Sequence, residues 1–171
     1  MTGVQTCALP ISEVVLAASG TDIHLFAAHL ATQGQPGPLQ AVMVEPSETG
    51  SGVPAALAAL HFASQTSQGR TVTRGVPVAP TPLQPPVGVK LRHADGSLRS
   101  VAEVDAEFAA HVTRLMQTDG RALLVLTDLS KTGLLAPSLA CATALRQCHG
   151  DQLTVLVEDR KSTRLNSSHR L

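Results

Sequence analysis

The chain has 171 residues, of which 43% are hydrophobic and 15% are charged, and its 13 lysines and arginines balance its 13 aspartates and glutamates. This composition predicts one soluble globular domain, while the balanced charge argues against a nucleic-acid partner and the lack of an apolar run of ~20 residues argues against a membrane span. The core has to be built from Val, Leu, Ile and Ala, because the chain has three Phe and no Trp or Tyr, and such a core is typical of buried parallel strands covered by helices.

The two ends of the chain read as translated adapter DNA. Residues 1–11 (MTGVQTCALPI) and 159–169 (DRKSTRLNSSH) can be encoded by reverse-complementary DNA when Met1 is a GTG start. All eleven codons fit, and selection on a protein gives no reason for such complementarity. The DNA resembles the adapter joined to both ends of sequencing-library fragments. We therefore expect residues 1–11 and 159–171 to be adapter-derived and residues 12–158 to be the gene-derived domain.

Several motif-like features fall within these expected adapter residues, including Cys7 and the glycosylation pattern at Asn166, and we assign them no function. Setting aside four of the 13 basic residues and one of the 13 acidic residues leaves nine and twelve, a mildly acidic domain for which we expect no nucleic-acid partner. No secretory signal is visible and three cysteines give no disulfide framework. We therefore expect a cytoplasmic location.

The first half of the domain predicts strands that alternate with helices. Residues 13–18 (EVVLAA) predict a strand, and residues 39–44 (LQAVMV) predict another. The apolar residues between them recur at helical spacing, at Ile23, Phe26, Ala27 and Leu30. A helix is therefore expected to begin near Asp22.

A less regular stretch follows the second predicted strand. Residues 45–52 predict a glycine-bearing loop, and residues 54–64 predict a helix with Pro54 at its start. Residues 65–86 hold several prolines and glycines and predict a long surface connection, within which residues 71–78 could form a strand.

The second half begins with two apolar runs, residues 87–92 and 98–101, on either side of a turn at Asp95-Gly96. Residues 101–117 predict a helix that Asp119-Gly120 closes. Its apolar stripe consists of Val104, Phe108, Val112 and Leu115. Its water-facing side is expected to carry Glu103, Asp105 and Glu107.

The last elements are the clearest. Residues 122–126 (ALLVL) and 153–157 (LTVLV) predict buried strands, and residues 138–148 between them predict a helix with Pro137 in its first turn. Strands that alternate with helices and are apolar throughout predict an α/β fold with a mainly parallel sheet and helices on both faces.

The segment Ser19-Gly20-Thr21-Asp22 lies between a predicted strand and the predicted helix that follows it. The free amides and positive dipole of a helix N-terminus favour an anion such as phosphate, and Ser19, Gly20 and Thr21 could hold one. Ser, Thr and Asp are also ordinary N-cap residues, so a plain helix cap is the alternative.

Two further loops could contribute to a site. Residues 48–52 (ETGSG) could cradle an anion or serve only as a connection, because they match neither the phosphate-loop nor the dinucleotide fingerprint. Asp128, Ser130 and Lys131 follow a strand at its carboxyl end, where open α/β sheets bind ligands. A solvated loop with Lys131 pointing outward is the alternative.

The histidines and cysteines give no metal-binding pattern. No HExxH spacing is present, and Cys141 and Cys148 lack a CxxC arrangement. We therefore expect no metal, and we expect both cysteines to pack beneath a helix as small apolar groups.

Three segments together resemble the front part of the large domain of fold-type I pyridoxal-phosphate enzymes, in the class V aminotransferase and cysteine desulfurase branch. ASGTD (18–22) is similar to the turn that holds the cofactor phosphate. HADGSLRSVAEVDAEFAAHV (93–112) is similar to the family's DG turn and following helix. Residues 122–158 resemble the strand, S/N-x-x-G loop, helix and strand that precede the aspartate facing the pyridine nitrogen.

The resemblance implies pyridoxal phosphate as cofactor, held by Ser19, Gly20, Thr21, Asp128, Ser130 and Glu158. It also implies an amino-acid substrate and a homodimeric parent.

The sequence departs from the family pattern at its end. Glu158 stands in place of the family's aspartate, and its codon crosses the expected adapter junction, so the parent gene could encode Asp there. The Gln or His and the Schiff-base lysine that follow in the family have no counterpart, so we assign no catalytic residue and expect a truncated, inactive fragment. No stacking aromatic ring is evident. The alternative is a non-catalytic, Rossmann-like ligand-binding module.

Overall fold

A computed structural model describes residues 19–33, 37–66, 68–78, 83–128, 130–131 and 133–158. These residues form a four-stranded, all-parallel sheet in the order β2-β1-β3-β4. The strands are β1 (Leu39–Val44), β2 (Gln84–Val89), β3 (Arg121–Thr127) and β4 (Leu153–Glu158). The helices are α1 (Gly20–Thr32), α2 (Val53–Leu57), α3 (Val101–Met116) and α4 (Leu139–His149), with a 3₁₀ turn η1 (Gly150–Gln152).

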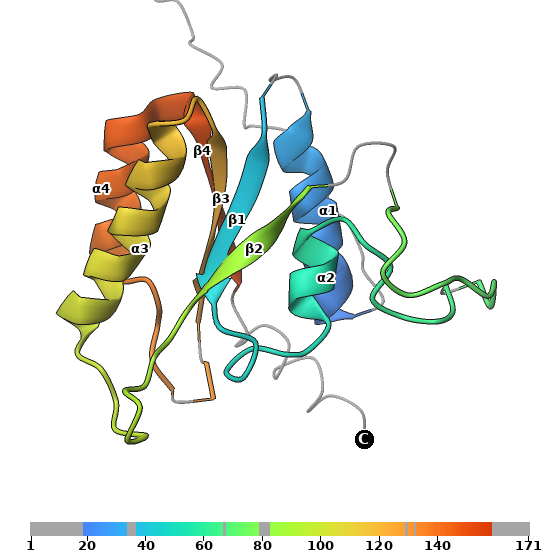
Figure 1. Cartoon of the computed structure of the whole chain (residues 1–171), viewed down its shortest axis with the longest axis horizontal. Helices are drawn as coiled ribbons and strands as arrows, with labels where there is room; N and C mark the ends of the chain where they lie inside the picture. The colour runs from blue at the N-terminus through green and yellow to red at the C-terminus, as the bar shows by residue number, and fades with distance from the viewer. Residues whose placement is uncertain are drawn as a thin grey trace, which may run out of the picture.

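Helices α1 and α2 cover one face of the sheet, and α3 and α4 cover the other (Figure 1). The expectation of an α/β fold with a mainly parallel sheet is thereby confirmed. The predicted strand at residues 13–18 and both expected adapter ends lie outside the described residues.

Strand β3 lies at the centre of both halves of the core. All seven of its residues are buried, and successive side chains point to opposite faces. Leu124 and Leu126 join a cluster with Phe108 of α3, whereas Leu123 and Val125 join a second cluster with Ala28 of α1. A strand that is buried on both faces needs apolar residues along its length, which explains the apolar run over residues 122–126 between Arg121 and Thr127.

The long connection before β2 is shorter than predicted. Gln84, Pro85 and Pro86 belong to β2, although prolines normally interrupt a sheet. They are tolerated because β2 is an edge strand, and because the pairing with β1 shifts register between Gln40 and Val42. The prediction of a loop through residue 86 was therefore wrong.

The helix predicted over residues 54–64 was also too long, since α2 ends at Leu57. Ala59 adopts a left-handed backbone with φ of 55°, and the chain then leaves the helix axis. Residues 71–78 form only isolated bridges, such as Pro77 with Leu60, and no strand.

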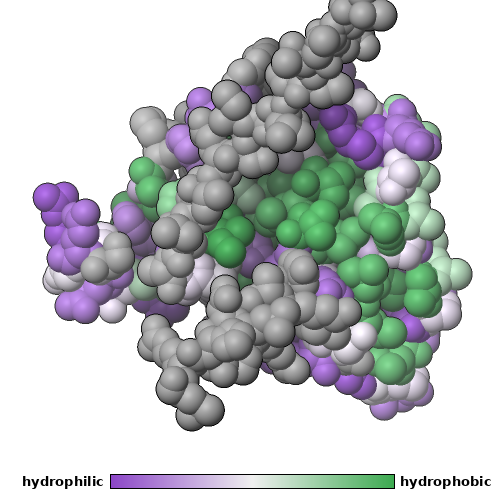
Figure 2. All heavy atoms as spheres, turned by 180° about the vertical axis from the view of Figure 1, so that it is seen from behind, coloured by the Kyte–Doolittle hydropathy of each residue, from purple (hydrophilic) through white to green (hydrophobic). Residues whose placement is uncertain are grey.

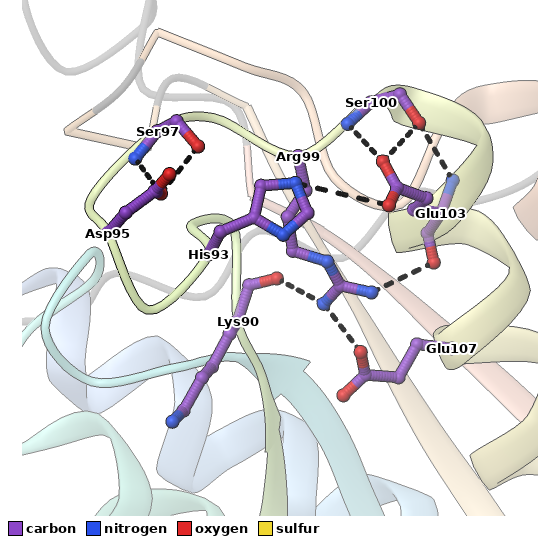
Figure 3. A network of polar contacts seen from close by, with 8 residues as sticks. All are labelled: Lys90, His93, Asp95, Ser97, Arg99, Ser100, Glu103 and Glu107. Carbon is purple, nitrogen blue, oxygen red and sulfur yellow. Dashed lines mark hydrogen bonds and ion pairs between the residues drawn. The ribbon is translucent and has the colours of Figure 1, made fainter.

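The Asp95-Gly96 turn is confirmed, with Gly96 at φ of 85°, a conformation that glycine adopts without strain. Arg92 and Leu98 form a single isolated bridge across it, so the run at 98–101 forms no strand and Val101 instead begins α3. Figure 3 shows how side chains hold this region together. Ser97 donates twice to Asp95, and the Arg99 guanidinium bridges the Lys90 carbonyl, at 2.8 Å, to Glu107, at 2.5 Å.

A side-chain contact links α3 to the start of α4. Asp105 accepts from the Ser138 amide at 2.8 Å and from the Ser138 hydroxyl at 2.5 Å, while Ser138 caps α4. Asp105 is therefore half-buried between two helices, and the prediction that it faces water was wrong. Pro137 precedes the cap instead of lying in the first turn of α4.

Phe108 is the residue on which the α3 face of the core depends most. Its side chain is fully buried, whereas Phe26 on α1 is 44% exposed. We expect Phe108→Ala to lower the free energy of unfolding by about 3–5 kcal/mol, because it leaves a cavity against the sheet. Phe26→Ala is the matched control and should cost much less. Chemical denaturation of both variants measures this, and equal losses would contradict the described core.

The capping box of α3 makes a pH-dependent contribution to stability. Hydrogen bonds from Ser100 lower the pKa of Glu103 below its ordinary value of 4.5. A lowered carboxyl pKa means that the stabilisation is fully present above pH 4.5 and is lost as the pH falls through the folded-state pKa. We expect Ser100→Ala to raise the pKa of Glu103, as measured by carboxyl ¹³C NMR. An unchanged pKa would show that the box has no such effect.

Candidate functional site

The carboxyl ends of the parallel strands form one edge of the molecule, where the N-terminus of α1 also lies (Figure 1). From β1 the chain crosses to β2 over the α2 face, and from β3 it crosses to β4 over the α4 face. Neighbouring strands whose connections leave in opposite directions create a crevice between their loops, and α/β proteins commonly bind ligands there.

The Ser19–Thr21 turn caps α1 in the way that the alternative interpretation predicts. The Ser19 hydroxyl oxygen accepts from the Asp22 amide at 3.3 Å and donates to the Asp22 carboxylate at 2.8 Å. Nothing lies within 4 Å of the position that a Cβ would occupy at Gly20. The Asp22 amide is occupied by the cap. The earlier amides of α1 have no partner further back in the helix, so they can still face an anion.

Gly52 brings the loop after β1 against this turn. A Cβ at Gly52 would lie 3.3 Å from Thr21 Cγ2 and 3.6 Å from the ring of Phe62. The side chains of Thr21 and Phe62 therefore both lie against Gly52, and sequence reasoning had identified no aromatic ring for this region. Phe62 follows the left-handed Ala59, and neither helical nor strand periodicity predicts where that bend sends the chain.

Glu158 lies at the end of β4, contacts Asp128 directly and is linked to the Ser19–Thr21 turn through His24. Its carbonyl oxygen accepts from the Asp128 amide at 3.0 Å. Its carboxylate lies 3.6 Å from Nε2 of His24, whose Nδ1 lies 2.9 Å from the carbonyl oxygen of Gly20. One buried imidazole on α1 thus spans the distance between the Gly20 turn and Glu158.

His24 was not predicted for this site, and Thr127 was predicted only as the first residue of the polar segment that follows the strand at residues 122–126. His24 is 2% exposed and faces the sheet from α1, where helical spacing alone suggests an ordinary core position. Thr127 is fully buried, pairs in register with Glu158, and its hydroxyl makes no hydrogen bond to any residue in the described ranges. A polar residue that ends a buried apolar strand is the sequence signal that could have identified Thr127.

Ser130 and Lys131 turn toward other partners. The Ser130 hydroxyl donates to the Leu134 carbonyl at 3.0 Å, within its own loop. Lys131 is exposed, and its ammonium donates to the Ser47 carbonyl at 2.5 Å. The Ser130 hydroxyl therefore stabilises its own loop. The Lys131 side chain joins two loops at the surface.

The loop at residues 48–52 carries a buried negative charge. Glu48 is 5% exposed, and its Oε1 accepts from Arg92 Nε at 3.1 Å. A buried carboxylate repels a second anion, so this geometry favours the interpretation of residues 48–52 as a connection over that of an anion cradle.

The donors and acceptors at this edge are separated in space. The α1 amides offer donors beside Ser19 and Thr21, and Glu158 offers an acceptor beside His24. This arrangement suits a small ligand with an anionic group at one end and an N–H donor at the other. In the described part of the chain, no three His, Cys, Asp or Glu side chains gather as metal ligands would.

A second concave region lies away from this edge. A hollow of about 580 Å³ opens between α1 and the β3–β4 face, and Leu30, Leu123 and Val155 contribute to its wall. Seen from behind, the molecule carries a broad apolar surface (Figure 2). The exposed apolar side chains of these elements are Ile23, Phe26, Leu30 and Val157. No helix in the described ranges has the length and apolar character required to cross a bilayer.

In comparisons with known proteins, no family model matches the chain, and no curated protein or solved structure matches it either. Any functional assignment therefore rests on the residues described above.

The two cysteines of the described residues differ in environment. Burial, with a smaller effect from Asp105, raises the pKa of the Cys141 thiol, whose sulfur lies 3.6 Å from the Asp105 carbonyl. Cys148 is exposed, so the expectation that it packs beneath the helix was wrong.

We expect iodoacetamide at mildly alkaline pH to modify Cys148 well before Cys141, because only the thiolate reacts. Mass spectrometry of tryptic peptides measures the two rates. Faster modification of Cys141 would contradict the described packing of α4 against α3.

Proposed function

We propose that the chain is part of the large domain of a fold-type I pyridoxal-phosphate enzyme of the class V aminotransferase and cysteine desulfurase branch, and that its parent acts on an amino acid. The observation that carries the proposal is the convergence of the Ser19–Thr21 turn, Asp128 and Glu158 at one edge of the sheet. The turn precedes both Asp128 and Glu158 by more than 100 positions in the sequence, yet the three are linked through one imidazole and one backbone hydrogen bond.

The residues present fit the cofactor in their chemistry. The first-turn amides of α1, with Thr21, would hold the phosphate, and the Glu158 carboxylate would accept from the ring nitrogen. The ring of Phe62 lies against Gly52, as the Thr21 side chain does. When bound, pyridoxal phosphate supplies an electron sink for amine chemistry. The chain's own residues bind and orient it, and Glu158 holds a proton at the ring nitrogen.

No residue of the described edge suits the covalent role of the family's lysine. Lys131 bonds the Ser47 carbonyl at the surface, and its amide donates to the Glu48 carbonyl at 3.3 Å. The proposal therefore places the lysine in gene sequence that follows the expected adapter junction.

A second candidate is a non-catalytic, Rossmann-like ligand-binding module. The observation that favours it is the contact between the loops after β1 and β3, where Arg92 bonds the Glu48 carboxylate and the Lys131 amide donates to the Glu48 carbonyl. Such a module needs no lysine and no carboxylate at the end of β4.

Recovery of the parent gene distinguishes the two candidates. Beyond Val157 we expect DNA that encodes an aspartate, a nearby Gln or His, and a lysine farther on. A gene that continues without them would support the ligand-binding module and reject the enzyme.

A binding experiment tests the proposal on the protein. The present chain mixed with pyridoxal phosphate should show no lysine-dependent absorbance band, whereas the parent extended through its own lysine should show one. Lys131→Ala and the control Lys90→Ala should behave alike in the present chain. A band that Lys131→Ala alone abolishes would make Lys131 the covalent residue and overturn the assignment.

A further inference from the structure

Strand β4 leaves one edge of the sheet open. It pairs with β3 on one side, and among the described residues nothing pairs with its other side. The carbonyl oxygen of Glu158 accepts from the Asp128 amide on the β3 side. Successive residues of a strand turn their backbone groups to opposite sides, so the amides of Val155 and Val157 point to the open edge. An apolar open edge can pair with a further strand.

The surface beside this edge is apolar as well. The hollow between α1 and the β3–β4 face lies here, and its wall includes Ala27 and Leu30 of α1 and Leu156 of β4. Leu30 is 64% exposed and Val157 is 59% exposed. Apolar area of this kind is stabilised when a further element of the fold covers it.

The direction of the crossovers determines where a strand before α1 has to lie. Helix α1 leads into β1 over the same face of the sheet that α2 crosses from β1 to β2 (Figure 1). Crossovers between parallel strands are right-handed, so all those over one face move across the sheet in the same direction. Since α2 moves away from β3 and β4, a strand before α1 lies on the β3–β4 side of β1. Because β1 pairs directly with β3 and β3 with β4, the first open position is the free edge of β4.

Residues 13–18 (EVVLAA) are the segment that this position suits. They end directly before Ser19, which caps α1. The start of α1 lies over the end of β4, because the His24 side chain contacts both the first turn of α1 and Glu158. A strand that runs up to Ser19 from the opposite edge of the sheet is therefore parallel to β4, and its six residues equal the six of β4.

The charges of the hollow agree with this placement. Glu13 begins the segment, and Arg121 and Arg146 line the hollow at the end where β3 and β4 begin. Among the described residues of its wall, these two guanidinium groups are accompanied by a single carboxylate, that of Asp151. This end of the hollow is therefore positive and favours the Glu13 carboxylate.

We propose that residues 13–18 form a fifth strand that runs parallel to β4 and pairs with its free edge. Side chains on one side of this strand fill the hollow below Leu30, and those on the other side cover Val157. The pairing concerns the chain as it stands and needs no cofactor, so it is independent of the proposed function.

Backbone amide hydrogen exchange, followed by NMR on the full chain, tests the pairing. We expect the amides of Val155 and Val157 to exchange about tenfold or more slowly than those of an unstructured peptide, because the fifth strand accepts hydrogen bonds from them. The double variant Val15→Asp with Leu16→Asp places a charge on each side of the segment and should abolish this protection. Unprotected Val155 and Val157 amides in the wild type would overturn the proposal.

The matched control is the double variant Val4→Asp with Leu9→Asp, which introduces the same charges within the expected adapter residues. It should leave the amides of Val155 and Val157 protected. Protection that persists in the variant of residues 15 and 16 would contradict the proposal. If that protection also increased with protein concentration, a second copy of the chain would be the occupant of the edge instead.

The wild-type protein alone provides a second measurement, in case the variant of residues 15 and 16 fails to fold. Nuclear Overhauser effects between strands should link residues 13–18 to Val155 and Val157. Effects that link the segment to β2, at the opposite edge of the sheet, would require a crossover of the opposite hand and would reject the proposal. The lack of any effect between the segment and β4 would reject it as well.

Discussion

Burial of β3 on both faces is the constraint on which the rest of the structure depends. A central parallel strand without a polar side has to be covered by a layer on each face, so α1 with α2 and α3 with α4 take opposite sides. Parallel pairing then places every strand's carboxyl end at the same edge. The position of the candidate site therefore follows from the burial of apolar β3 before any functional residue is considered.

That edge is also where the buried apolar pattern ends. Thr127 and Glu158 are the last residues of adjacent strands, in register with each other, and each follows an apolar run. Burying polar groups there carries a desolvation cost, which apolar residues at the same positions would avoid. The proposed binding role would account for polar residues here, since apolar residues at these positions would extend the core.

The sequence predicted much of the fold because its signals were local. The apolar runs of β1, β3 and β4 and the stripe of α3 needed only periodicity, and all were confirmed. Local signals failed where context decided the outcome. Pro85 and Pro86 could join a strand only because β2 is at the sheet edge. Helix α2 is shorter than predicted because Ala59 adopts a left-handed backbone conformation. Neither fact is encoded in composition or spacing.

The site was predictable in its strand-end positions but not in its contacts. The residues that follow a strand could be identified in sequence, which is how Asp128 and Glu158 were selected. The residue that joins them to α1, His24, could not be identified in this way. It lies on a helix whose exposed and buried sides differ little in sequence, since Phe26 is exposed and His24 is buried. A buried imidazole among apolar neighbours becomes informative only when its two partners are known. Here both partners, the Gly20 carbonyl and the Glu158 carboxylate, lie at the edge where the strands end, so the contact that sequence reasoning missed is the one that connects the segments it selected.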